Sequence, residues 1–494
     1  MTAEDVSKRW GREMERVTAV RDMAVLCEEG VKMQRRFHWR VGGTAVLVAC
    51  AGALLFLAGA TAGASGTVGS FSYGELQAQT TNASGCGTNI DGEPAVEVSN
   101  QNNLFLGSER GLGGGSDGWR ETPALGGAGA DPCAAVYAGQ PNAVAGTGAS
   151  GGDIDLAWGS APAASGNDPL YVASLNLGSV AVAHSTDNGH TFLNVPVQGG
   201  LPVDDREWVA AYGATTSLLT FHDIATFDID VLRSDDGGLS YHQISQAIPA
   251  TDYKASNNEL GNVAIDRLNT AGAAAGQFWV YQSYVAPSSA PKLTSGGSYN
   301  EAFLAVSNDG GFSWTQRPIG CSVSSRSLDH QFPNVSVDPA GTVWVAWSDD
   351  LSIFVAHSSD HGATWACEKA STTPQSVMPW LAAASGGVDL VYYGTPSSPC
   401  KGKTCNPTWY VYFAQRLNGT WQSSQLMPVH TGTICESGFS CSSGRQLYDD
   451  FGVDVDRNGY AHIAYSHDAP NLGGSDTYTG YAVQTSGTTI GVTN

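Results

Sequence analysis

The stretch SSDHGATW at residues 358–365 decides the fold of this chain, because its pattern occurs four times. Each copy places an Asp two residues after a Ser, a Gly two residues after the Asp, and a hydroxyl residue beside an aromatic one. The Asp can accept hydrogen bonds from backbone N–H groups of its own turn, and the Gly can adopt a positive φ. We therefore predict structural turns at Asp187, Asp236, Asp309 and Asp360, within STDNGHTF (185–192), SDDGGLSY (234–241), SNDGGFSW (307–314) and SSDHGATW.

Each of these turns belongs to a longer repeat of alternating apolar and polar residues. The segments FPNVSVDPAGTVWVAW (332–347) and DFGVDVDRNGYAHIAY (450–465) each contain two such runs around a polar turn with Gly. That pattern is typical of a β-hairpin. A third run leads into the turn, as IFVAHSSD does at 353–360, and a fourth run follows it. Each repeat therefore predicts a four-stranded antiparallel sheet.

Repeated four-stranded sheets pack radially as a β-propeller. Counting the second strands along the chain favours seven blades in an all-β domain that covers residues 86–494. Six blades are the alternative, if residues 93–135 serve only to close the ring with the C-terminal strands.

The eight-residue pattern resembles the Asp-box, or bacterial neuraminidase, repeat S-x-D-x-G-x-[ST]-[WFY]. The four copies cover residues 180–370, and weaker blades extend the resemblance to about 86–490. The resemblance implies a sialidase-like propeller in which the boxes lie at the periphery of the blades. It also implies that the loops entering the innermost strands form the ligand-binding face.

The resemblance to sialidases further implies a catalytic set in those loops. Sialidases hold a substrate carboxylate with three arginines and use a Tyr nucleophile, a Glu that activates it and an Asp acid/base. The positions that suit these roles are Arg206, Arg326 and Arg445 for the carboxylate, Tyr448 as nucleophile, Glu207 or Glu259 as its activator, and Asp91 or Asp205 as acid/base. Two further candidates for ligand binding in the same loops are His330 and Asp449.

The chain also departs from the sialidase pattern. The F/Y-R-I-P motif that opens the first blade of a sialidase is absent, and EPAVEV stands at 93–98. We therefore predict that the propeller recognises a glycan or protein ligand at the mouth of its channel. The alternative is an exo-acting glycoside hydrolase, either of sialidase type or with two carboxylates whose separation sets a retaining or an inverting mechanism.

Charge is distributed unevenly along the chain. Residues 1–40 contain nine Lys or Arg and seven Asp or Glu, whereas residues 64–494 contain 15 and 39. A strongly acidic second part argues against DNA, RNA or an anionic membrane surface as its partner. It suits neutral ligands or divalent cations better.

The segment VGGTAVLVACAGALLFLAGATAG at 41–63 contains no charged residue and is long enough to span a bilayer as a helix. Basic residues precede it in KMQRRFHWR (32–40), so the positive-inside rule places residues 1–40 in the cytoplasm. We predict a single-pass protein of the cell membrane with a flexible Gly/Ser/Thr/Gln-rich linker at 64–85 and an extracellular propeller. A cleaved signal peptide is the alternative, since small residues follow the apolar run.

The cysteines agree with an external location of the propeller. Cys27 and Cys50 precede residue 64, and the remaining eight form an even set that suits an oxidising compartment. No paired C-x-x-C spacing occurs, which argues against a zinc site. Proximity in the sequence favours the disulfides Cys400–Cys405, Cys435–Cys441, Cys321–Cys367 and Cys86–Cys133.

The segment DVDRNG at 454–459 matches the start of a calcium loop. The twelfth position of that loop is Tyr465 instead of Glu, and the segment aligns with the plain hairpin SVDPAG at 336–341. The pattern therefore favours an ordinary turn, with a structural calcium ion as the alternative. We assign no metal-binding residue and no cofactor from the sequence.

Overall fold

The computed structural model describes residues 65–493, with gaps at 67, 79, 112–113, 144–151, 177–178, 198–203, 292–297, 330–331, 398–405, 437–440 and 442–445. The predicted cytoplasmic segment at 1–40 and the predicted membrane helix at 41–63 lie outside the described residues. Among the residues that are described, no helix is long and apolar enough to cross a membrane.

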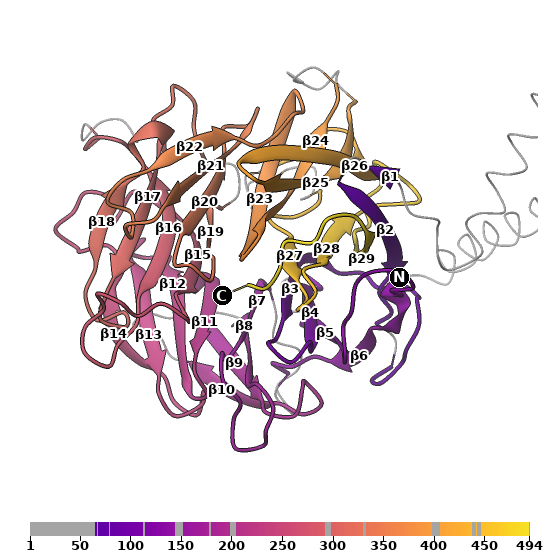
Figure 1. Ribbon diagram of the computed structural model, residues 1–494, viewed down its shortest axis with the longest axis horizontal. Coiled ribbons are helices and arrows are strands. Elements are labelled where there is room, and N and C mark those ends of the chain that lie inside the picture. The colour runs from indigo at the N-terminus through magenta and orange to yellow at the C-terminus, as the bar shows by residue number, and fades with distance from the viewer. Residues whose placement is uncertain are drawn as a thin grey trace, which may run out of the picture. The chain divides into compact units, whose positions relative to one another are not determined.

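The described strands form six antiparallel sheets of four strands and a seventh sheet of five. Figure 1 shows these sheets arranged radially around a centre, which is the architecture of a β-propeller. The prediction of seven four-stranded blades is confirmed, and the six-blade alternative is wrong because residues 92–139 form a complete sheet of their own.

We number the sheets blades 1 to 7 along the chain, each with its innermost strand first. Blade 1 contains β3 (Gly92–Val98), β4 (Leu104–Glu109), β5 (Ser116–Glu121) and β6 (Val136–Gly139); blade 2 contains β7 (Ile154–Trp158), β8 (Leu170–Asn176), β9 (Ser179–Ser185) and β10 (Leu193–Val197); blade 3 contains β11 (Asp204–Tyr212), β12 (Thr216–Asp223), β13 (Ile229–Ser234) and β14 (His242–Gln246). Two short 3-10 helices, η1 (Pro132–Ala134) and η2 (Gly320–Ser322), connect strands.

The second half of the ring repeats this arrangement. Blade 4 contains β15 (Glu259–Ile265), β16 (Val280–Ala286), β17 (Glu301–Ser307) and β18 (Thr315–Pro318); blade 5 contains β19 (Asn334–Val337), β20 (Val343–Ser348), β21 (Ile353–Ser358) and β22 (Ala366–Lys369); blade 6 contains β23 (Gln375–Ala384), β24 (Gly387–Thr395), β25 (Thr408–Leu417) and β26 (Thr420–Thr431); blade 7 contains β27 (Gly452–Val455), β28 (Ala461–His467), β29 (Tyr478–Ser486), β2 (Gly69–Glu75) and β1 (Ser65–Gly66).

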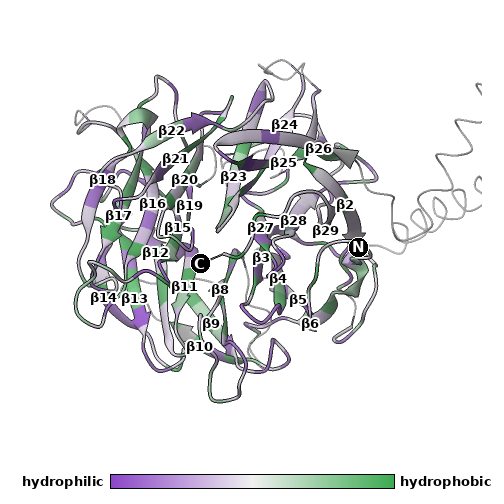
Figure 2. Cartoon of the chain, in the orientation of Figure 1, coloured by the Kyte–Doolittle hydropathy of each residue, from purple (hydrophilic) through white to green (hydrophobic). Residues whose placement is uncertain are grey.

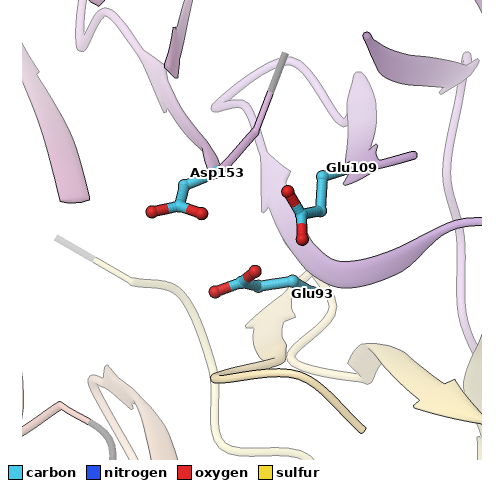
Figure 3. A group of neighbouring side chains, drawn as sticks. All are labelled: Glu93, Glu109 and Asp153. Atoms are coloured by element: carbon cyan, nitrogen blue, oxygen red, sulfur yellow. The ribbon is translucent and has the colours of Figure 1, made fainter. Parts of the chain in front are cut away.

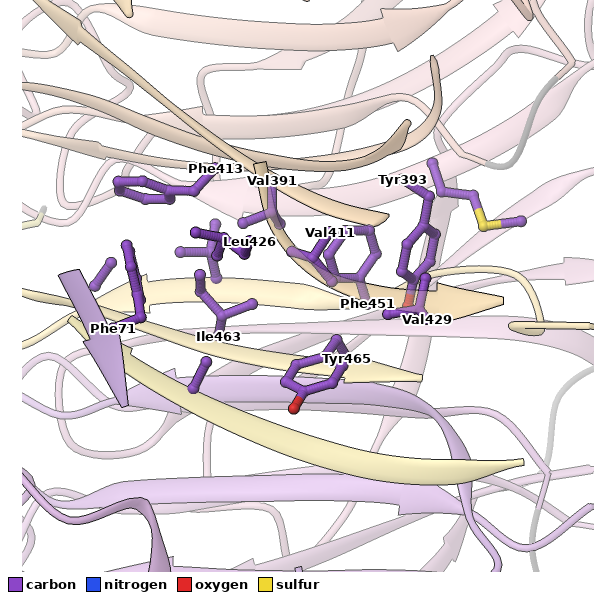
Figure 4. Close-up of a cluster of buried hydrophobic side chains, with 14 of the residues drawn as sticks. Phe71, Val391, Tyr393, Val411, Phe413, Leu426, Val429, Phe451, Ile463 and Tyr465 are labelled. Carbon is purple, nitrogen blue, oxygen red and sulfur yellow. The ribbon is translucent and has the colours of Figure 1, made fainter. Parts of the chain in front are cut away.

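Blade 7 combines the two ends of the described chain and thereby closes the ring. Strand β2 pairs antiparallel with β29, so residues predicted as part of a flexible linker at 64–85 are a strand of the last blade. The linker prediction is wrong here because Phe71 and Tyr73 alternate with small residues and bury their rings in the blade. Figure 4 shows Phe71 within the buried cluster of blades 6 and 7, where its ring centroid lies 5.0 Å from that of Phe413.

The innermost strands β3, β7, β11, β15, β19, β23 and β27 contact one another in succession around the ring. At four junctions an Asp or Asn side chain of one inner strand accepts the backbone N–H of the next strand. The pairs are Asp155 with Val209 (2.7 Å), Asn262 with Val335 (2.6 Å), Asn334 with Leu381 (2.8 Å) and Asp454 with Val98 (2.7 Å). These bonds satisfy backbone donors that would otherwise be buried without a partner.

The inner strands enclose a cavity of about 100 Å³ that is lined by residues of all seven blades and by Thr493. Apolar residues lie along the strands and polar ones in many of the connecting turns, as the hydropathy colouring in Figure 2 shows. The hydrophobic core therefore lies between neighbouring blades, and the polar loops are left to form the two faces of the ring.

The four box motifs are turns between the third and fourth strands of blades 2 to 5, as predicted. In the fourth box, Asp360 accepts the backbone N–H of Thr364 at 2.8 Å and its hydroxyl at 2.7 Å, while Ser358 donates its hydroxyl to Asp360 at 2.7 Å. Gly362 has a φ of 81°, a value at which a residue with a side chain would be strained. Asp187, Asp236 and Asp309 have the same partners in their own turns.

Three of the four expected disulfides are present: Cys86–Cys133, Cys321–Cys367 and Cys435–Cys441. The expected pair of Cys400 and Cys405 lies outside the described residues. The DVDRNG segment is the turn between β27 and β28, in which Asp456 accepts the backbone N–H groups of Asn458 and Tyr460. Asp454, the first residue of the motif, accepts the backbone N–H of Val98 in blade 1. The interpretation of this motif as a hairpin turn is therefore confirmed.

Candidate ligand site at the channel mouth

The mouth of the channel is built by irregularities at the start of the inner strands. Strands β3 and β11 each contain a register shift, and within it Glu93 and Arg206 adopt positive φ values of 57° and 55°. Such a bulge adds a residue to one strand and changes the direction of its side chain. A positive φ is uncommon for residues with a Cβ, so these two positions are held by the surrounding fold.

Arg206 lies at the centre of this mouth, and its side chain is 5% exposed. Its Nη1 donates to Oε1 of Glu93 at 2.8 Å and lies 3.4 Å from Oδ2 of Asp153, and its Nη2 donates to Asp450. The carboxylates come from blades 1, 2 and 7, so the guanidinium connects three parts of the ring. Burial lowers the pKa of Arg206, but the three carboxylates outweigh burial and raise that pKa above its ordinary value.

An aromatic cluster lies beneath Arg206. The guanidinium carbon is 4.5 Å from the ring centroid of Trp208 and 4.3 Å from that of Phe332, which are cation–π distances. Trp208 also packs against Trp380, with ring centroids 5.5 Å apart. Trp380 also lines the channel cavity, so this cluster connects the surroundings of Arg206 with the cavity wall.

The mouth contains more carboxylates than Arg206 can neutralise. Burial and the charge of Asp153 raise the pKa of Asp205 to about 6, and they raise the pKa of Glu207 well above its ordinary range. Burial also raises the pKa of Glu259, and repulsion from Asp329 and Asp205 raises it further. Glu93, Glu109 and Asp153 direct carboxylate oxygens toward one another, as Figure 3 shows.

The structure therefore brings several of the sequence-predicted residues together. Asp205 and Glu207 flank Arg206, and the charges of Asp449 and Glu259 act within the same cluster. Tyr448 is half-buried, and its ring covers Gly92: a Cβ at that glycine would lie 2.4 Å from Cδ2 of the tyrosine. Tyr448, the predicted nucleophile, therefore packs against the residue that precedes Glu93.

Asp91 belongs to a different arrangement within blade 1. It is fully buried beside Asp117, and Nε of Arg110 lies 3.9 Å and 3.7 Å from oxygens of the two carboxyl groups. The hydroxyl of Tyr137 donates to Asp117 at 2.8 Å. Burial and repulsion from Asp117 raise the pKa of Asp91 to about 9, so this carboxyl group holds a proton at neutral pH.

The three-arginine arrangement implied by the sialidase resemblance is not formed by the described residues. Arg326 donates its Nη2 to Asp350 and its Nε to the carbonyl of Asp349, both at 2.7 Å, and both partners lie in the turn after β20. Arg206 is enclosed by its own carboxylates. Arg445 and His330 lie outside the described residues. Arg206 and Arg326 thus pair with different carboxylates of the protein, and the role of the three arginines in binding a substrate carboxylate stays a prediction.

Sequence reasoning placed Glu93 and Asp450 among the polar residues of the predicted ligand-face loops without a specific role, and it did not consider Glu109 or Asp153. Glu93 and Asp450 stand just before apolar strands, which is the position that drew attention to the other candidates. Glu109 ends the second strand of blade 1, and Asp153 follows a Gly-rich stretch. Only the pairing of Glu109 with Gly92 across β3 and β4 brings its side chain to the mouth.

The topology and the four boxes define this protein as a seven-bladed Asp-box β-propeller. No protein-family model and no curated protein matches the chain. Among solved structures, an α-L-arabinofuranosidase from Fusarium graminearum in complex with an iminosugar inhibitor is similar, at 11% identity and a TM-score of 0.46 over 85% of this chain and 98% of that one. The NanB sialidase from Streptococcus pneumoniae is 9% identical, with a TM-score of 0.40 over 83% and 70%.

A third similar structure is the GH74 enzyme from Niastella koreensis, at 13% identity and a TM-score of 0.48. The match covers 82% of this chain and 53% of that enzyme. These likenesses concern the fold alone, since all the identities are low.

Proposed function

We propose that the channel mouth binds an uncharged carbohydrate. The observation that carries this proposal is the enclosure of Arg206 by Glu93, Asp153 and Asp450, which pairs its positive charge with carboxylates of the protein. Carboxylates accept hydrogen bonds from sugar hydroxyls, and an anionic ligand would be repelled by the surplus of negative charge. An uncharged, hydroxyl-rich ligand is therefore the class that this surface suits.

The ligand would contact the residues of the mouth that are only partly buried. These are Asp205, Glu259, Trp380 and Tyr448. The carboxylates would accept hydroxyl hydrogen bonds, and the aromatic faces would pack against the apolar face of a sugar ring.

Binding is tested by a glycan array that carries both neutral and sialylated glycans, probed with the full-length protein. We expect retention on neutral glycans that falls at least tenfold in Glu259→Gln. The matched control is Asp235→Asn, which changes an exposed carboxylate within the second box, outside the mouth. Selective retention on sialylated glycans, or equal binding by Glu259→Gln and wild type, would contradict the proposal.

Hydrolysis of the bound sugar is a second candidate function. It is favoured by the charge of Asp205 acting on Glu259, since the two carboxyl groups come from adjacent blades and both are partly open to a ligand. Glycosidases use two carboxyl groups, one as acid and the other as base or nucleophile. Assays on neutral fluorogenic glycosides test this candidate. Turnover that is lost in both Asp205→Asn and Glu259→Gln supports it, whereas binding without turnover supports recognition alone.

We also propose that the propeller lies outside the cytoplasm, held by the apolar segment 41–63. Three disulfides in the described residues support an oxidising compartment. Protease treatment of intact cells should release the propeller, and protection of the propeller would contradict this orientation. A mature chain that begins near residue 61–66 would indicate cleavage instead of anchoring.

A further inference from the structure

The loop between β12 and β13 presents an aromatic side chain at the edge of the mouth. This loop, residues 224–228, follows Asp223, which pairs with Asp204 at the start of β11. The loop therefore lies at the same edge of blade 3 as the channel mouth. Within it, Phe227 is 47% exposed and Ile224 is 37% exposed. An exposed aromatic residue is ordinary by itself, so its contacts decide whether it belongs to the ligand site.

His222 connects Phe227 with one carboxylate of the proposed ligand site. In the pairing of β11 with β12, His222 lies directly opposite Asp205. Side chains that face each other across antiparallel strands have Cβ atoms about 5 Å apart. The rings of Phe227 and His222 pack edge to face, with centroids 6.2 Å apart. Phe227 and Asp205 are therefore neighbours of the same side chain.

Asn258 connects Phe227 with a second carboxylate of that site. Asn258 is 1% exposed and directly precedes Glu259, the first residue of β15. Its Oδ1 lies 2.7 Å from Nε2 of His222, and its Nδ2 donates to the carbonyl of Phe227 at 3.1 Å. The loop of blade 3 is thus fixed to the start of blade 4, and Phe227 lies beside both Asp205 and Glu259 in the fold.

The backbone of Phe227 is held in a conformation that is uncommon for an aromatic residue. Its φ is 61°, in the left-handed region. Its N–H donates to the carbonyl of Asp223 at 2.6 Å, and the carboxylate of Asp223 accepts the N–H of Ala225 at 2.8 Å. Asn or Gly would adopt this φ more easily, so the turn itself does not require a phenyl ring. Strained positions of this kind cluster at functional sites, and a loop that is already fixed loses little entropy when a ligand binds.

We propose that Phe227 forms an outer subsite of the mouth and that the ligand is an uncharged oligosaccharide of two or more units. This inference rests on the proposed carbohydrate function and specifies the ligand class of the same site. One sugar unit hydrogen-bonds to Asp205 and Glu259, and the next unit packs its apolar face on the exposed phenyl ring. The apolar area that this contact buries favours the longer ligand.

The probes are cello-, malto-, xylo- and arabino-oligosaccharides of one to four units, titrated against the full-length protein by calorimetry. In a series that binds, the affinity should rise at least tenfold between one unit and two. Phe227→Ala should abolish this gain and leave the affinity for one unit unchanged, whereas Phe227→Trp should keep the gain. The matched control is Phe312→Ala, which removes a phenyl ring of similar exposure, 49%, in the third box.

A further variant separates binding from folding. Phe227→Asn suits the positive φ and should fold with a Tm close to that of the wild type while losing the gain in affinity with length. Equal affinity for every length, or an unchanged gain in Phe227→Ala and Phe227→Asn, would overturn the outer subsite alone. Glu259→Gln should instead weaken binding at every length. Failure of every neutral sugar to bind would overturn the proposed function together with this inference, so the two failures are distinguishable.

Discussion

The box turns and the channel mouth are both rich in carboxylates, but the two regions surround that group in opposite ways. In the fourth box, hydrogen bonds from Thr364 and Ser358 lower the pKa of Asp360 to about 2. At the mouth, burial and the charge of Asp153 raise the pKa of Asp205 to about 6. The carboxylate of Asp360 is exposed and accepts hydrogen bonds from donors of its own turn, whereas the carboxylate of Asp205 is surrounded by other acidic groups.

The difference shows that the residue type does not decide the role of an aspartate in this protein. A tight turn presents backbone N–H groups that have no partner in a strand, and the box aspartate accepts them. The N–H groups of an inner strand already bond to neighbouring strands. A carboxylate at the mouth must therefore be neutralised by Arg206, by a proton or by a cation, which is the property expected of a functional site.

The largest effect is expected from removing the positive charge of the mouth. Arg206→Met leaves Glu93, Asp153 and Asp450 buried without their guanidinium partner and should lower the free energy of unfolding by about 3–5 kcal/mol at pH 7. Arg206→Lys keeps the charge but loses the planar contacts and should be affected less. Urea denaturation measures both, and a wild-type midpoint for Arg206→Met would show that the acids of the mouth do not need this neutralisation.

The next prediction tests whether burial with a single hydrogen-bond donor is enough to raise a carboxyl pKa. Asp389 in β24 is fully buried, accepts one bond from Gln415 at 2.9 Å, and has a pKa that burial raises to about 8. The unfolded chain ionises this group near 3.8, while the folded protein keeps the proton until about pH 8.

The contribution of Asp389 to stability is therefore complete below about pH 4 and is lost as the pH rises to about 8. The unfolding free energy should fall by up to about 1.4 kcal/mol for each pH unit across this range because of this group. Asp389→Asn should remove that part of the slope. Equal pH profiles for Asp389→Asn and wild type in chemical denaturation would indicate that the group is already ionised in the folded state.

A smaller effect is expected at the periphery. Asp360→Ala removes the acceptor of the turn and should lower the free energy of unfolding by about 1–3 kcal/mol without changing ligand affinity of the folded protein. Asp476→Ala is the matched control, since that exposed aspartate lies outside the box turns and should change stability by about 0.5 kcal/mol or less. Loss of ligand binding at unchanged stability in Asp360→Ala would give the box a functional role.

The smallest change in stability is expected at the mouth, together with a large change in binding. Asp205→Asn removes one of several repelling charges and should alter the free energy of unfolding by less than about 1 kcal/mol. Neutral-glycan affinity should fall at least tenfold, as measured by tryptophan fluorescence titration. Unchanged affinity would remove Asp205 from the ligand site and weaken the contrast between the two regions.

Much of the fold could be predicted because its signals are local. The box turns depend on residues within four positions of each other, and the blades depend on alternation within single strands. The prediction for residues 64–85 was wrong because β2 has only two large apolar residues, Phe71 and Tyr73, in a Gly- and Ser-rich stretch. Its stability as a strand comes from β29, which lies about 400 residues further along the chain.

The candidate site was predicted less completely. Asp205, Glu207 and Glu259 were candidates because they lie at the start of predicted inner strands, but Glu109 and Asp153 carry no such signal. The sequence also did not predict that Arg326 pairs with Asp349 and Asp350 in the turn after β20. An alignment of motif positions cannot show which of several acids a guanidinium will meet.

The amino-acid sequence alone was sufficient for the β-strands, the box turns and the propeller, since these follow from the conformational preferences of short segments, and tertiary structure decided between seven blades and six. Tertiary structure was needed to close the ring through β2 and to choose the partners of Arg206. It was also needed to gather Glu93, Glu109, Asp153 and Glu207 at one mouth. The reason is physical: the pKa and the ligand preference of a carboxylate depend on burial and on charges a few ångströms away, and those neighbours come from blades that are distant in the chain.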